Sequence, residues 1–475
     1  MGSGLRWCYL KRPAWGDATS LEDRFSASFL RRVQPGALCY TGGPIGTRIW
    51  RKTMRIRFVH SADLHLDSPF TGLKAAAPEN VADRLYSATF EAYDNIVNLC
   101  ISEEVDALLV AGDVYDGADR SLRAQLKFVE GLKKLDAKGV RSFVCHGNHD
   151  PSDGWEARLN YPAGCHCFGP EWEAVPVSDD ANGVVIHGIS YPKRDVAENL
   201  ARRLGRVEPS PFSIGLLHAN VSNDPNHAPY APCSLDDLAA SGIDYWALGH
   251  VHTRQVPSER EPAVVYPGNP QGRHPNESGP RGVYLVEVDD GGNVGLDFRP
   301  MDTVRWARLD SDIGAFRTEQ ELLDALHERM QGVLDGADGR SVVVRMTLTG
   351  RGELNRTLRR PNTIEDLVEE INREWAERSP FAWCERIEDA SASPFDREAR
   401  LKGSDFLAEV LRTADRAKTD PELMARLGGG LSDLYQHHRF RRYLSRFAPD
   451  EEELTVLVDE AEAMAVDMLV EDEDR

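Results

Sequence analysis

At 475 residues the chain is too long for one hydrophobic core, so two or three domains are expected. Its composition, 41% hydrophobic and 28% charged, is that of an ordinary soluble globular protein, and no apolar stretch approaches the roughly 20 residues of a membrane span. The formal net charge of −21 argues against a simple basic nucleic-acid binder, although metal ions or a partner could supply the positive charge. The eight cysteines are scattered and favour a reducing, cytoplasmic environment.

The first 53 residues differ in composition from the rest of the chain. They contain nine lysines and arginines against three acidic residues, and they lack the apolar core of a secretory signal. We therefore expect residues 1–53 to be a disordered extension or a mis-assigned start, with the folded protein beginning at Met54.

Residues 54–295 alternate between strand-like apolar runs and helical patterns, which indicates a layered α/β domain. The expected strands cover residues 56–62, 106–113, 141–148, 183–190, 212–220, 245–250 and 263–269. Two helices are expected between the first three strands. Their apolar faces are predicted to consist of Val81, Leu85, Ala88, Ala92, Ile96 and Leu99 in the first helix, and of Leu122, Leu126, Val129, Leu132 and Leu135 in the second. Ser234 is the expected N-cap of a later, short helix.

The pattern then changes to a smaller α+β unit, which we expect to form a capping domain over residues 296–400. Its expected helices and strands cover residues 318–334, 341–350, 363–378 and 382–389. Residues 401–475 are expected to form a helical, partner-docking region. The last helix carries an apolar stripe that either packs on its own domain or docks a partner. The stripe consists of Leu454, Leu457, Ala461, Met464 and Met468.

Five of the expected strands end in carboxylate, imidazole or amide side chains. These are Asp63, His65, Asp113, Asp116, Asn148, His149, Asp150, His218, His250 and His252. Open α/β sheets place their sites at such strand ends. Gly112, Gly147 and Gly249 each precede one of these residues, where a tight turn is expected. The donors include no sulfur, which favours Mn²⁺, Fe²⁺ or Zn²⁺ over a soft-metal site.

The motifs D-x-H, G-D-x-x-D-G, G-N-H-D, a strand-end histidine and G-H-x-H occur in this order. They resemble those of the calcineurin-like dinuclear metallophosphoesterases. The segment PGNPQGRHPNESGPRG, at residues 267–282, narrows the resemblance to the bacterial SbcD-type DNA repair exonucleases and their YhaO-like branch. The resemblance implies a metallophosphoesterase fold over residues 54–295, a layered β-sandwich flanked by helices.

The resemblance also implies a site for two divalent metal ions, with Mn²⁺ expected first and Fe²⁺ or Zn²⁺ as alternatives. One ion would be bound by Asp63, His65 and His252, and the other by Asn148, His218 and His250. Asp113 would bridge the two ions.

Four further residues receive roles from the same resemblance or from their position. His149 would orient the phosphate or protonate the leaving oxygen, and Asp116 would pair with His149 and fix its tautomer. Archaeal and eukaryotic nucleases of this group usually have a histidine at the position of Asp116, which leaves the preference for exonuclease or endonuclease activity open. Arg273 and His274 are candidate contacts to the substrate backbone, with an ordinary structural loop as the alternative.

Other polar residues near the motifs are expected to be structural. Asp67 would brace the D-x-H loop, Asp150 would accept backbone N–H groups in its turn, and His187 would be a core histidine. The basic stretch 437–446 could contact nucleic acid, with a solvated amphipathic helix as the alternative.

We therefore expect a two-metal phosphodiesterase that hydrolyses DNA phosphodiester bonds, a DNA repair exonuclease subunit of the cytoplasm. One alternative keeps the metal site but acts on a small nucleotide or phosphodiester, and another is a non-catalytic scaffold. The resemblance implies an SbcC-like coiled-coil ATPase as the partner, bound through the C-terminal helices. A homodimer is also compatible with the sequence.

Overall fold

The computed structural model describes residues 55–68, 77–117, 121–155, 157–178, 183–221, 230–436 and 448–473. All of these belong to one compact unit, Thr53–Arg475. The segment 1–53, expected to be a disordered extension or a mis-assigned start, lies outside the described residues, and so does the basic stretch 437–446.

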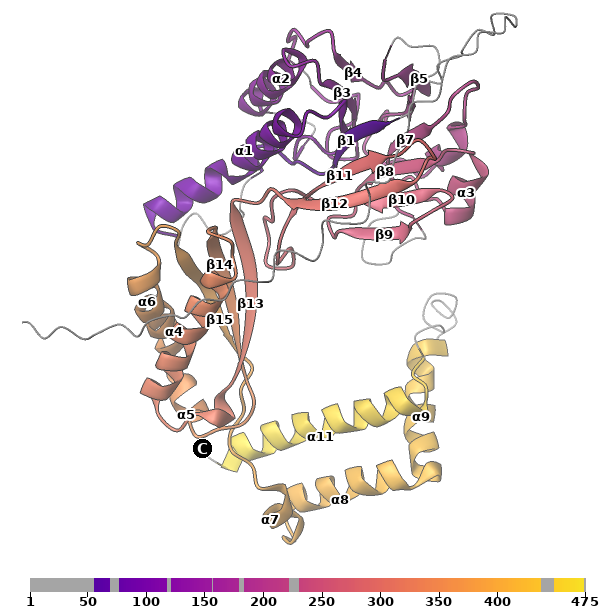
Figure 1. The fold of residues 1–475 in the computed structure, drawn as a ribbon. Helices are drawn as coiled ribbons and strands as arrows, with labels where there is room; N and C mark the ends of the chain where they lie inside the picture. Colours follow the sequence, from indigo (N-terminus) through magenta and orange to yellow (C-terminus); the bar gives the residue numbers. More distant parts are fainter. Residues whose placement is uncertain are drawn as a thin grey trace, which may run out of the picture. The chain divides into compact units, whose positions relative to one another are not determined.

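One six-stranded sheet has the strand order β12-β11-β1-β2-β3-β4 (Figure 1). Its strands are β1 (Ile56–Ser61), β2 (Ala107–Ala111), β3 (Arg141–Cys145), β4 (Cys165–Cys167), β11 (Gly282–Val288) and β12 (Val294–Pro300). Strands β1 to β4 are parallel, whereas β11 is antiparallel to both of its neighbours. Because β1, β2 and β3 are parallel, their carboxyl ends lie at the same edge, shortly before Asp63, Asp113 and Asn148.

A second six-stranded sheet has the order β5-β6-β7-β8-β10-β9. Its strands are β5 (Glu173–Pro176), β6 (Val185–Gly188), β7 (Ser213–His218), β8 (Tyr245–Gly249), β9 (Gln255–Ser258) and β10 (Ala263–Tyr266). The four central strands are parallel, and the edge strands β5 and β9 are antiparallel to their neighbours. His218 is the last residue of β7, and His250 directly follows β8.

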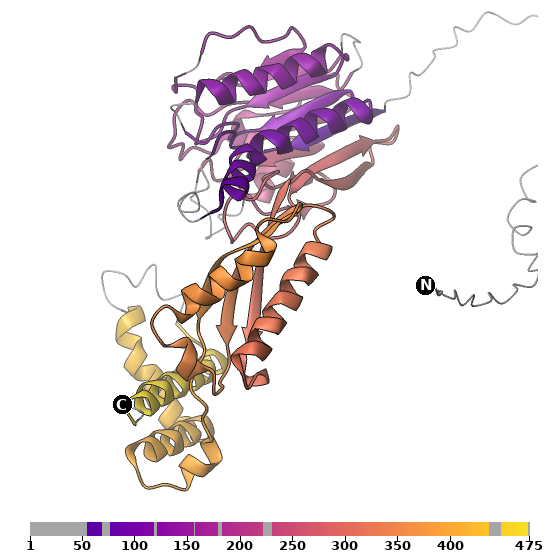
Figure 2. The ribbon, with the colours of Figure 1, turned by 90° about the vertical axis from the view of Figure 1, so that its left-hand side faces the viewer.

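The two sheets pack face to face around one hydrophobic core, which includes Phe58 and Phe143 from the first sheet and Ile214 and Tyr245 from the second. Each such side chain stabilises the fold by roughly 1.5–3 kcal/mol when fully buried. Helices cover the outer faces: α1 and α2 lie side by side on the first sheet (Figure 2), and α3 and the 3-10 helix η1 lie on the second. Their bounds are α1 (Glu79–Ser102), α2 (Leu122–Asp136), α3 (Leu235–Ala240) and η1 (Leu200–Arg203). The predicted layered β-sandwich flanked by helices is therefore confirmed.

The predicted apolar face of α1 is buried except at Leu99, which is half-buried, whereas that of α2 is wrong at two positions. Leu122 and Leu126 are 52% and 51% exposed, and Phe128 is buried in their place. The spacing of the apolar residues in α2 fits two neighbouring faces of the helix. The contact with the sheet determines which of these two faces is buried. Ser234 caps α3 as predicted, because its hydroxyl accepts the N–H of Asp237 at 3.1 Å.

The next part of the chain forms a parallel three-stranded sheet, β13-β14-β15, with helices packed on it. Its elements are β13 (Val304–Asp312), η2 (Ile313–Ala315), α4 (Glu319–Asp335), β14 (Ser341–Thr349), α5 (Asn355–Leu358), α6 (Thr363–Trp375) and β15 (Ala382–Asp389). Trp306 and Trp383 share a small core with Val81 and Leu85 of α1. This core joins the three-stranded sheet to the first helix of the β-sandwich.

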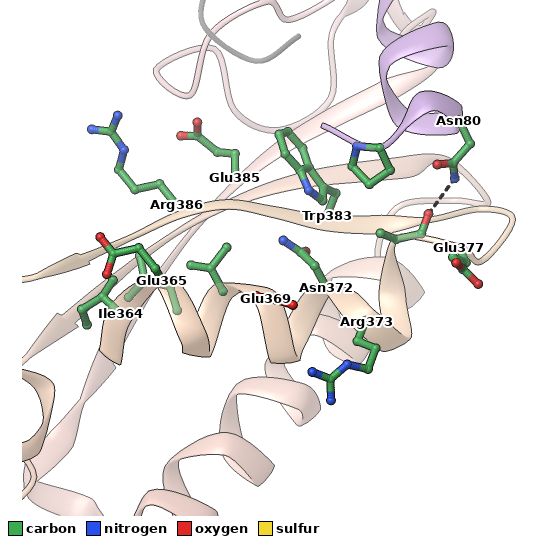
Figure 3. Close-up of a pocket in the computed structure, with 14 residues that line it drawn as sticks. Asn80, Ile364, Glu365, Glu369, Asn372, Arg373, Glu377, Trp383, Glu385 and Arg386 are labelled. Atoms are coloured by element: carbon green, nitrogen blue, oxygen red, sulfur yellow. Dashed lines mark hydrogen bonds between the residues drawn. The ribbon is translucent and has the colours of Figure 1, made fainter. Parts of the chain in front are cut away.

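A groove between α6 and β15 reaches the start of α1 (Figure 3). Its volume is about 620 Å³, and the buried Trp383 forms part of its wall. At one end, Asn80 Nδ2 donates to the carbonyl oxygen of Ala376 at 2.7 Å. None of the expected metal ligands lines this groove.

Four described helices follow, and the first, second and fourth of them contribute to a small core of their own. They are α7 (Arg397–Leu401), α8 (Phe406–Thr419), α9 (Pro421–Gln436) and α11 (Glu451–Glu473). α11 packs through Val466 and Leu469. Leu457 is 39% exposed and Met464 and Met468 are each 66% exposed, whereas Leu454 is half-buried beside Gly428 of α9. The predicted stripe therefore lies outside the packed face from Leu457 onward. None of the described helices is long and apolar enough to cross a membrane.

Candidate metal centre

The strand ends at the site have backbone conformations that non-glycine residues rarely adopt. The φ angle is +52° at Asp63, +42° at His65, +50° at Asp113 and +99° at His250. Each such residue costs on the order of 1–3 kcal/mol, and such strain is concentrated at functional sites. Backbone hydrogen bonds hold the turns together, from Asp63 N to Gly112 O at 3.1 Å and from His65 N to Asp113 O at 3.0 Å. The ends of β1 and β2 are thereby locked to each other.

Three glycines allow the strand ends to approach closely. A Cβ at Gly112 would lie 2.3 Å from His218 Nδ1, one at Gly147 would lie 2.3 Å from Asp113 Oδ1, and one at Gly249 would lie 1.8 Å from the carbonyl oxygen of Ala111. Of the three, Gly112 has a positive φ, +85°. The expected tight turn therefore explains Gly112, while Gly147 and Gly249 are required because any side chain would collide with the site.

The structure brings the expected ligands of the first ion together. The donor atoms of Asp63, His65 and His252 lie within 4.8 Å of one another. The Nε2 atoms of His65 and His252 are 3.1 Å apart. Two imidazole nitrogens at this distance share either a proton or a metal ion.

A second group shares Asp63 with the first. Asp63, Asp113 and His218 also have donor atoms within 4.8 Å of one another. One carboxylate oxygen of Asp113, Oδ2, lies 3.4 Å from His218 Nε2 and 3.8 Å from His65 Nε2. Asp113 is therefore placed between the two groups.

The remaining two expected ligands lie beside His218. Asn148 Oδ1 is 3.0 Å from His218 Nε2, and the ring centroids of His218 and His250 are 5.2 Å apart. The backbone N–H of His250 donates to both carboxylate oxygens of Asp63, at 3.1 and 3.2 Å. All seven expected ligands therefore occupy one neighbourhood at the carboxyl ends of the two sheets.

Burial and charge at this cluster suit a cation. Burial lowers the pKa of His65 to about 3, so its imidazole is neutral at pH 7 and keeps a lone pair for a metal. Burial also opposes ionisation of His218, but the carboxylates of Asp113 and Asp63 raise its pKa to about 9. Burial raises the pKa of Asp63. The raised pKa of His218 shows that the two buried carboxylates favour a positive charge at this place. Carboxylate and imidazole donors together fit Mn²⁺, Fe²⁺ or Zn²⁺.

Asp116 and His149 lie at the side of this cluster. His149 Nδ1 is 3.3 Å from the carbonyl oxygen of Asp116 and 3.8 Å from its carboxylate. The carboxylate is closer to His65, with 3.0 Å between Asp116 Oδ1 and His65 Nδ1. The predicted pairing of Asp116 with His149 thus runs mainly through the backbone carbonyl, while the side chain of Asp116 faces His65.

Two family models match the chain: calcineurin-like phosphoesterase over residues 56–254, and the middle domain of metallophosphoesterase YhaO over residues 306–392. The uncharacterized metallophosphoesterase YhaO of Bacillus subtilis (strain 168) is 35% identical over 404 residues, which cover 83% of this chain and 94% of that protein. The chain belongs to the YhaO-type calcineurin-like metallophosphoesterases. It is therefore a hydrolase of phosphoester bonds, with a candidate dimetal centre at the sandwich edge.

Two further relatives of this metallophosphoesterase carry names that refer to DNA or to a nuclease. The DNA double-strand break repair protein Mre11 of Methanopyrus kandleri is 28% identical, over 56% of this chain and 61% of that protein. The SbcD subunit of the nuclease SbcCD of Bacillus subtilis (strain 168) is 24% identical, over 50% of this chain and 67% of that protein.

The two candidate substrate contacts of this metallophosphoesterase differ in position. Arg273 reaches the site, where its Nη1 donates to Asp116 Oδ1 at 2.8 Å and to Ser68 Oγ at 2.7 Å. His274 is exposed, and its Nδ1 accepts the N–H of Asn276 at 3.2 Å. The structure therefore brings Arg273 to the cluster and leaves His274 in the surrounding loop.

The predictions of structural roles are confirmed. Asp67 accepts from Ser121 Oγ, the N-cap of α2, at 2.6 Å. Asp150 accepts the backbone N–H groups of Gly147 and Val114 at 2.8 and 2.9 Å. His187 is fully buried and stacks on Trp172, outside the metal cluster. These contacts hold the loops of the metallophosphoesterase site to their neighbours.

Glu277 also belongs to the surroundings of the cluster, although no sequence motif indicated it. Its Oε1 lies 2.7 Å from His252 Nδ1, on the side of the ring opposite the cluster. The residue lies within the segment 267–282 that narrowed the family resemblance, but a single glutamate in an irregular loop gives no periodic signal. A search for acidic residues that follow the G-H-x-H motif could have identified it.

Proposed function

We propose that this metallophosphoesterase is a two-metal phosphodiesterase that cleaves DNA, as the nuclease subunit of a repair complex. The observation that carries the proposal is the position of Asp113, whose Oδ2 faces both histidine groups at 3.4 and 3.8 Å. In the proposed assignment one ion would be held by Asp63, His65 and His252 and the other by Asn148, His218 and His250, with Asp113 shared between them.

The proposed roles of the metal ions and of His149 follow from their chemistry. Two divalent ions, when bound, supply Lewis-acid polarisation of a phosphodiester and activation of a water molecule. The chain itself contributes His149, whose side chain is 35% exposed at the edge of the cluster. Its Nδ1 faces the carbonyl oxygen of Asp116, which requires a proton on Nδ1. The imidazolium form then carries a second proton on Nε2, which it donates to the leaving oxygen and so returns to the neutral Nδ1–H ring.

Arg273 is proposed to position the substrate backbone. Its guanidinium is anchored by Asp116 and Ser68 beside the cluster. A charge fixed in this way is well placed to bind a phosphate oxygen, because an arginine fork loses little freedom when it is already held. The exposed His274 is kept as a weaker candidate for the same role.

DNA is proposed as the substrate because of the names of two relatives, a DNA double-strand break repair protein and a nuclease subunit. The test compares end-labelled DNA with a small chromogenic phosphodiester, each with Mn²⁺, using wild type, His149→Ala and Asp113→Ala. Cleavage of DNA that is lost in both variants supports the proposal. Turnover of the small substrate alone favours a small-molecule phosphodiesterase, and no turnover of either favours a scaffold. Parallel reactions with Fe²⁺ and Zn²⁺ identify the metal preference.

An SbcC-like coiled-coil ATPase is proposed as the partner. One relative is named as a single subunit of the SbcCD nuclease, which motivates the search for a second subunit. In the described part of the chain, α11 exposes Leu457, Met464 and Met468 on one face. An exposed apolar stripe on an otherwise acidic helix is suited to docking against a groove or helix of another protein.

A further inference from the structure

The loop that follows β10 reaches back to the metal cluster through one carboxylate. Glu277 Oε1 lies 2.7 Å from Nδ1 of His252, while Nε2 of the same ring lies 3.1 Å from His65 Nε2. The two ring nitrogens of His252 therefore have different surroundings, a carboxylate on one side and the cluster on the other.

This arrangement selects one tautomer of His252. An ionised carboxylate only accepts hydrogen bonds, so Glu277 requires the proton to be on Nδ1. The lone pair of Nε2 then faces the cluster, which is the state that a metal ligand must have.

The carboxylate of Glu277 is itself fixed. Its second oxygen, Oε2, accepts the side-chain N–H of Asn269 at 3.0 Å and the backbone N–H of Arg273 at 2.7 Å. Arg281 Nε donates to the Glu277 carbonyl oxygen at 3.1 Å, and its Nη1 donates to the carbonyl oxygen of His252. Hydrogen bonds therefore fix the side chain of Glu277 and also the backbone carbonyl groups of Glu277 and His252.

The same loop is anchored on the first strand of the three-stranded sheet. The amide of the buried Gln271 accepts the N–H of Thr303 at 2.9 Å and donates to the carbonyl oxygen of Val304 at 2.6 Å. Trp306 Nε1 donates to Gly272 O at 3.2 Å. The loop therefore cannot move Glu277 without breaking buried hydrogen bonds at β13.

We propose that Glu277 is a positioning residue of the metal centre, which holds His252 in the Nδ1–H tautomer and in the orientation that binds the first ion. The inference rests on the proposed role of His252 as a ligand. It predicts that loss of the Glu277 carboxylate weakens one of the two metal sites and leaves the other intact, because Glu277 contacts His252, whereas the ring nitrogens of His218 face the carbonyl oxygen of Ala111 and Asn148 Oδ1.

The test uses the full chain in the variants Glu277→Gln and Glu277→Asp, with Glu173→Gln as the matched control. Glu173 is also a glutamate that faces a histidine, 3.1 Å from His166 Nε2, and it also accepts a backbone N–H, from Gly169, but it lies outside the cluster. Calorimetric titration with Mn²⁺ should show two sites in wild type. In Glu277→Gln one affinity should fall about 10- to 100-fold while the other is unchanged. Glu277→Asp, which keeps the charge, should recover part of the loss.

A second measurement does not depend on bound metal. In ¹⁵N-histidine-labelled protein, the ring nitrogens of His252, assigned by their absence in His252→Ala, should report the Nδ1–H tautomer in wild type and a mixture in Glu277→Gln. Two unchanged Mn²⁺ affinities in Glu277→Gln, or an unchanged tautomer, would overturn the inference while the proposed function stands. A wild-type protein that binds no second ion would overturn the proposed function and the inference with it.

Discussion

His65 and His252 are 187 positions apart in the sequence, yet their Nε2 atoms lie 3.1 Å from each other. One residue follows β1 in the first sheet and the other follows β8 in the second, so the contact closes the edge of the sandwich. Each ring also has a carboxylate near Nδ1, Asp116 at 3.0 Å for His65 and Glu277 at 2.7 Å for His252. The hydrogen bond from His252 Nδ1 to Glu277 orients that ring, with its Nε2 toward His65 and the place where a cation is expected.

The first prediction concerns metal binding and stability. Mn²⁺ should raise the free energy of unfolding, because a ligand that binds only the folded state stabilises it by about 2.7 kcal/mol per site at one hundred times its Kd. Asp113→Asn should remove most of this gain, since the buried Asp113 carboxylate faces both histidine groups. Thermal unfolding of chelator-treated protein, with and without added Mn²⁺, measures the effect.

The matched control for Asp113→Asn is Asp290→Asn, which neutralises an exposed carboxylate in a turn far along the chain. It should gain as much stability from Mn²⁺ as wild type does. An equal gain in Asp113→Asn would show that the buried carboxylate takes no part in binding the metal.

The second prediction distinguishes a role of His149 in proton transfer from a role in metal binding. His149→Ala should lower phosphodiesterase turnover by about 10²–10⁴-fold, the usual contribution of a general acid, with both Mn²⁺ affinities unchanged. The physical reason is position, because the imidazole lies at the edge of the cluster with Nδ1 turned to the Asp116 carbonyl oxygen. Steady-state kinetics and calorimetric titration on the same preparation test it, with His166→Ala, at a partly exposed histidine outside the cluster, as the control. A parallel loss of metal affinity would make His149 a ligand instead.

The site could be predicted from the sequence because its residues are carried by motifs at strand ends. Asp63 and His65 follow an apolar run, and the parallel pairing of β1 with β2 brings them to Asp113. Glu277 could not be predicted in this way, since it lies in an irregular loop where no strand or helix period restricts its direction. Its role depends on hydrogen bonds to Asn269 and Arg273, which only the folded loop creates.

The fold was predictable at the level of layers and less so at the level of helix faces. The apolar runs predicted β1, β2, β3, β6, β7, β8 and β10, since buried parallel strands are continuously hydrophobic. They did not predict β4, β5, β9, β11 or β12, and the two-sheet arrangement was implied by the family resemblance. Leu122 and Leu126 were assigned to the core because their spacing fits a helix face, yet they are exposed. The periodicity predicts that one face of a helix is apolar. The angle at which the helix packs on its sheet determines which residues of that face are buried.

The third prediction concerns the stability at acid pH. Burial, and next the charge of Arg206, lower the pKa of His187 to about 4 from its usual 6.5. The folded state therefore binds fewer protons at His187 than the unfolded state between these values. The contribution of the neutral histidine is fully present above pH 6.5 and is lost as the pH falls toward 4, by at most about 3 kcal/mol.

His187→Phe keeps an aromatic ring to stack on Trp172 and removes the titrating group. The free energy of unfolding, from urea denaturation at pH 7, 5.5 and 4.5, should therefore fall less steeply in the variant than in wild type. Parallel curves for His187→Phe and wild type would contradict the prediction.

The fourth prediction concerns the exposed stripe of α11. Replacing both Met464 and Met468 by glutamate should abolish co-purification with the SbcC-like ATPase, because two buried charges without partners would oppose docking. Since both side chains are 66% exposed in the free chain, the thermal unfolding temperature and Mn²⁺ binding should be unchanged. The control Glu460→Ala alters an exposed residue of the same helix and should leave the association intact. If the double variant still binds the ATPase, the stripe is not the docking surface, and an unfolding temperature lowered by several degrees would show instead that it packs within its own domain.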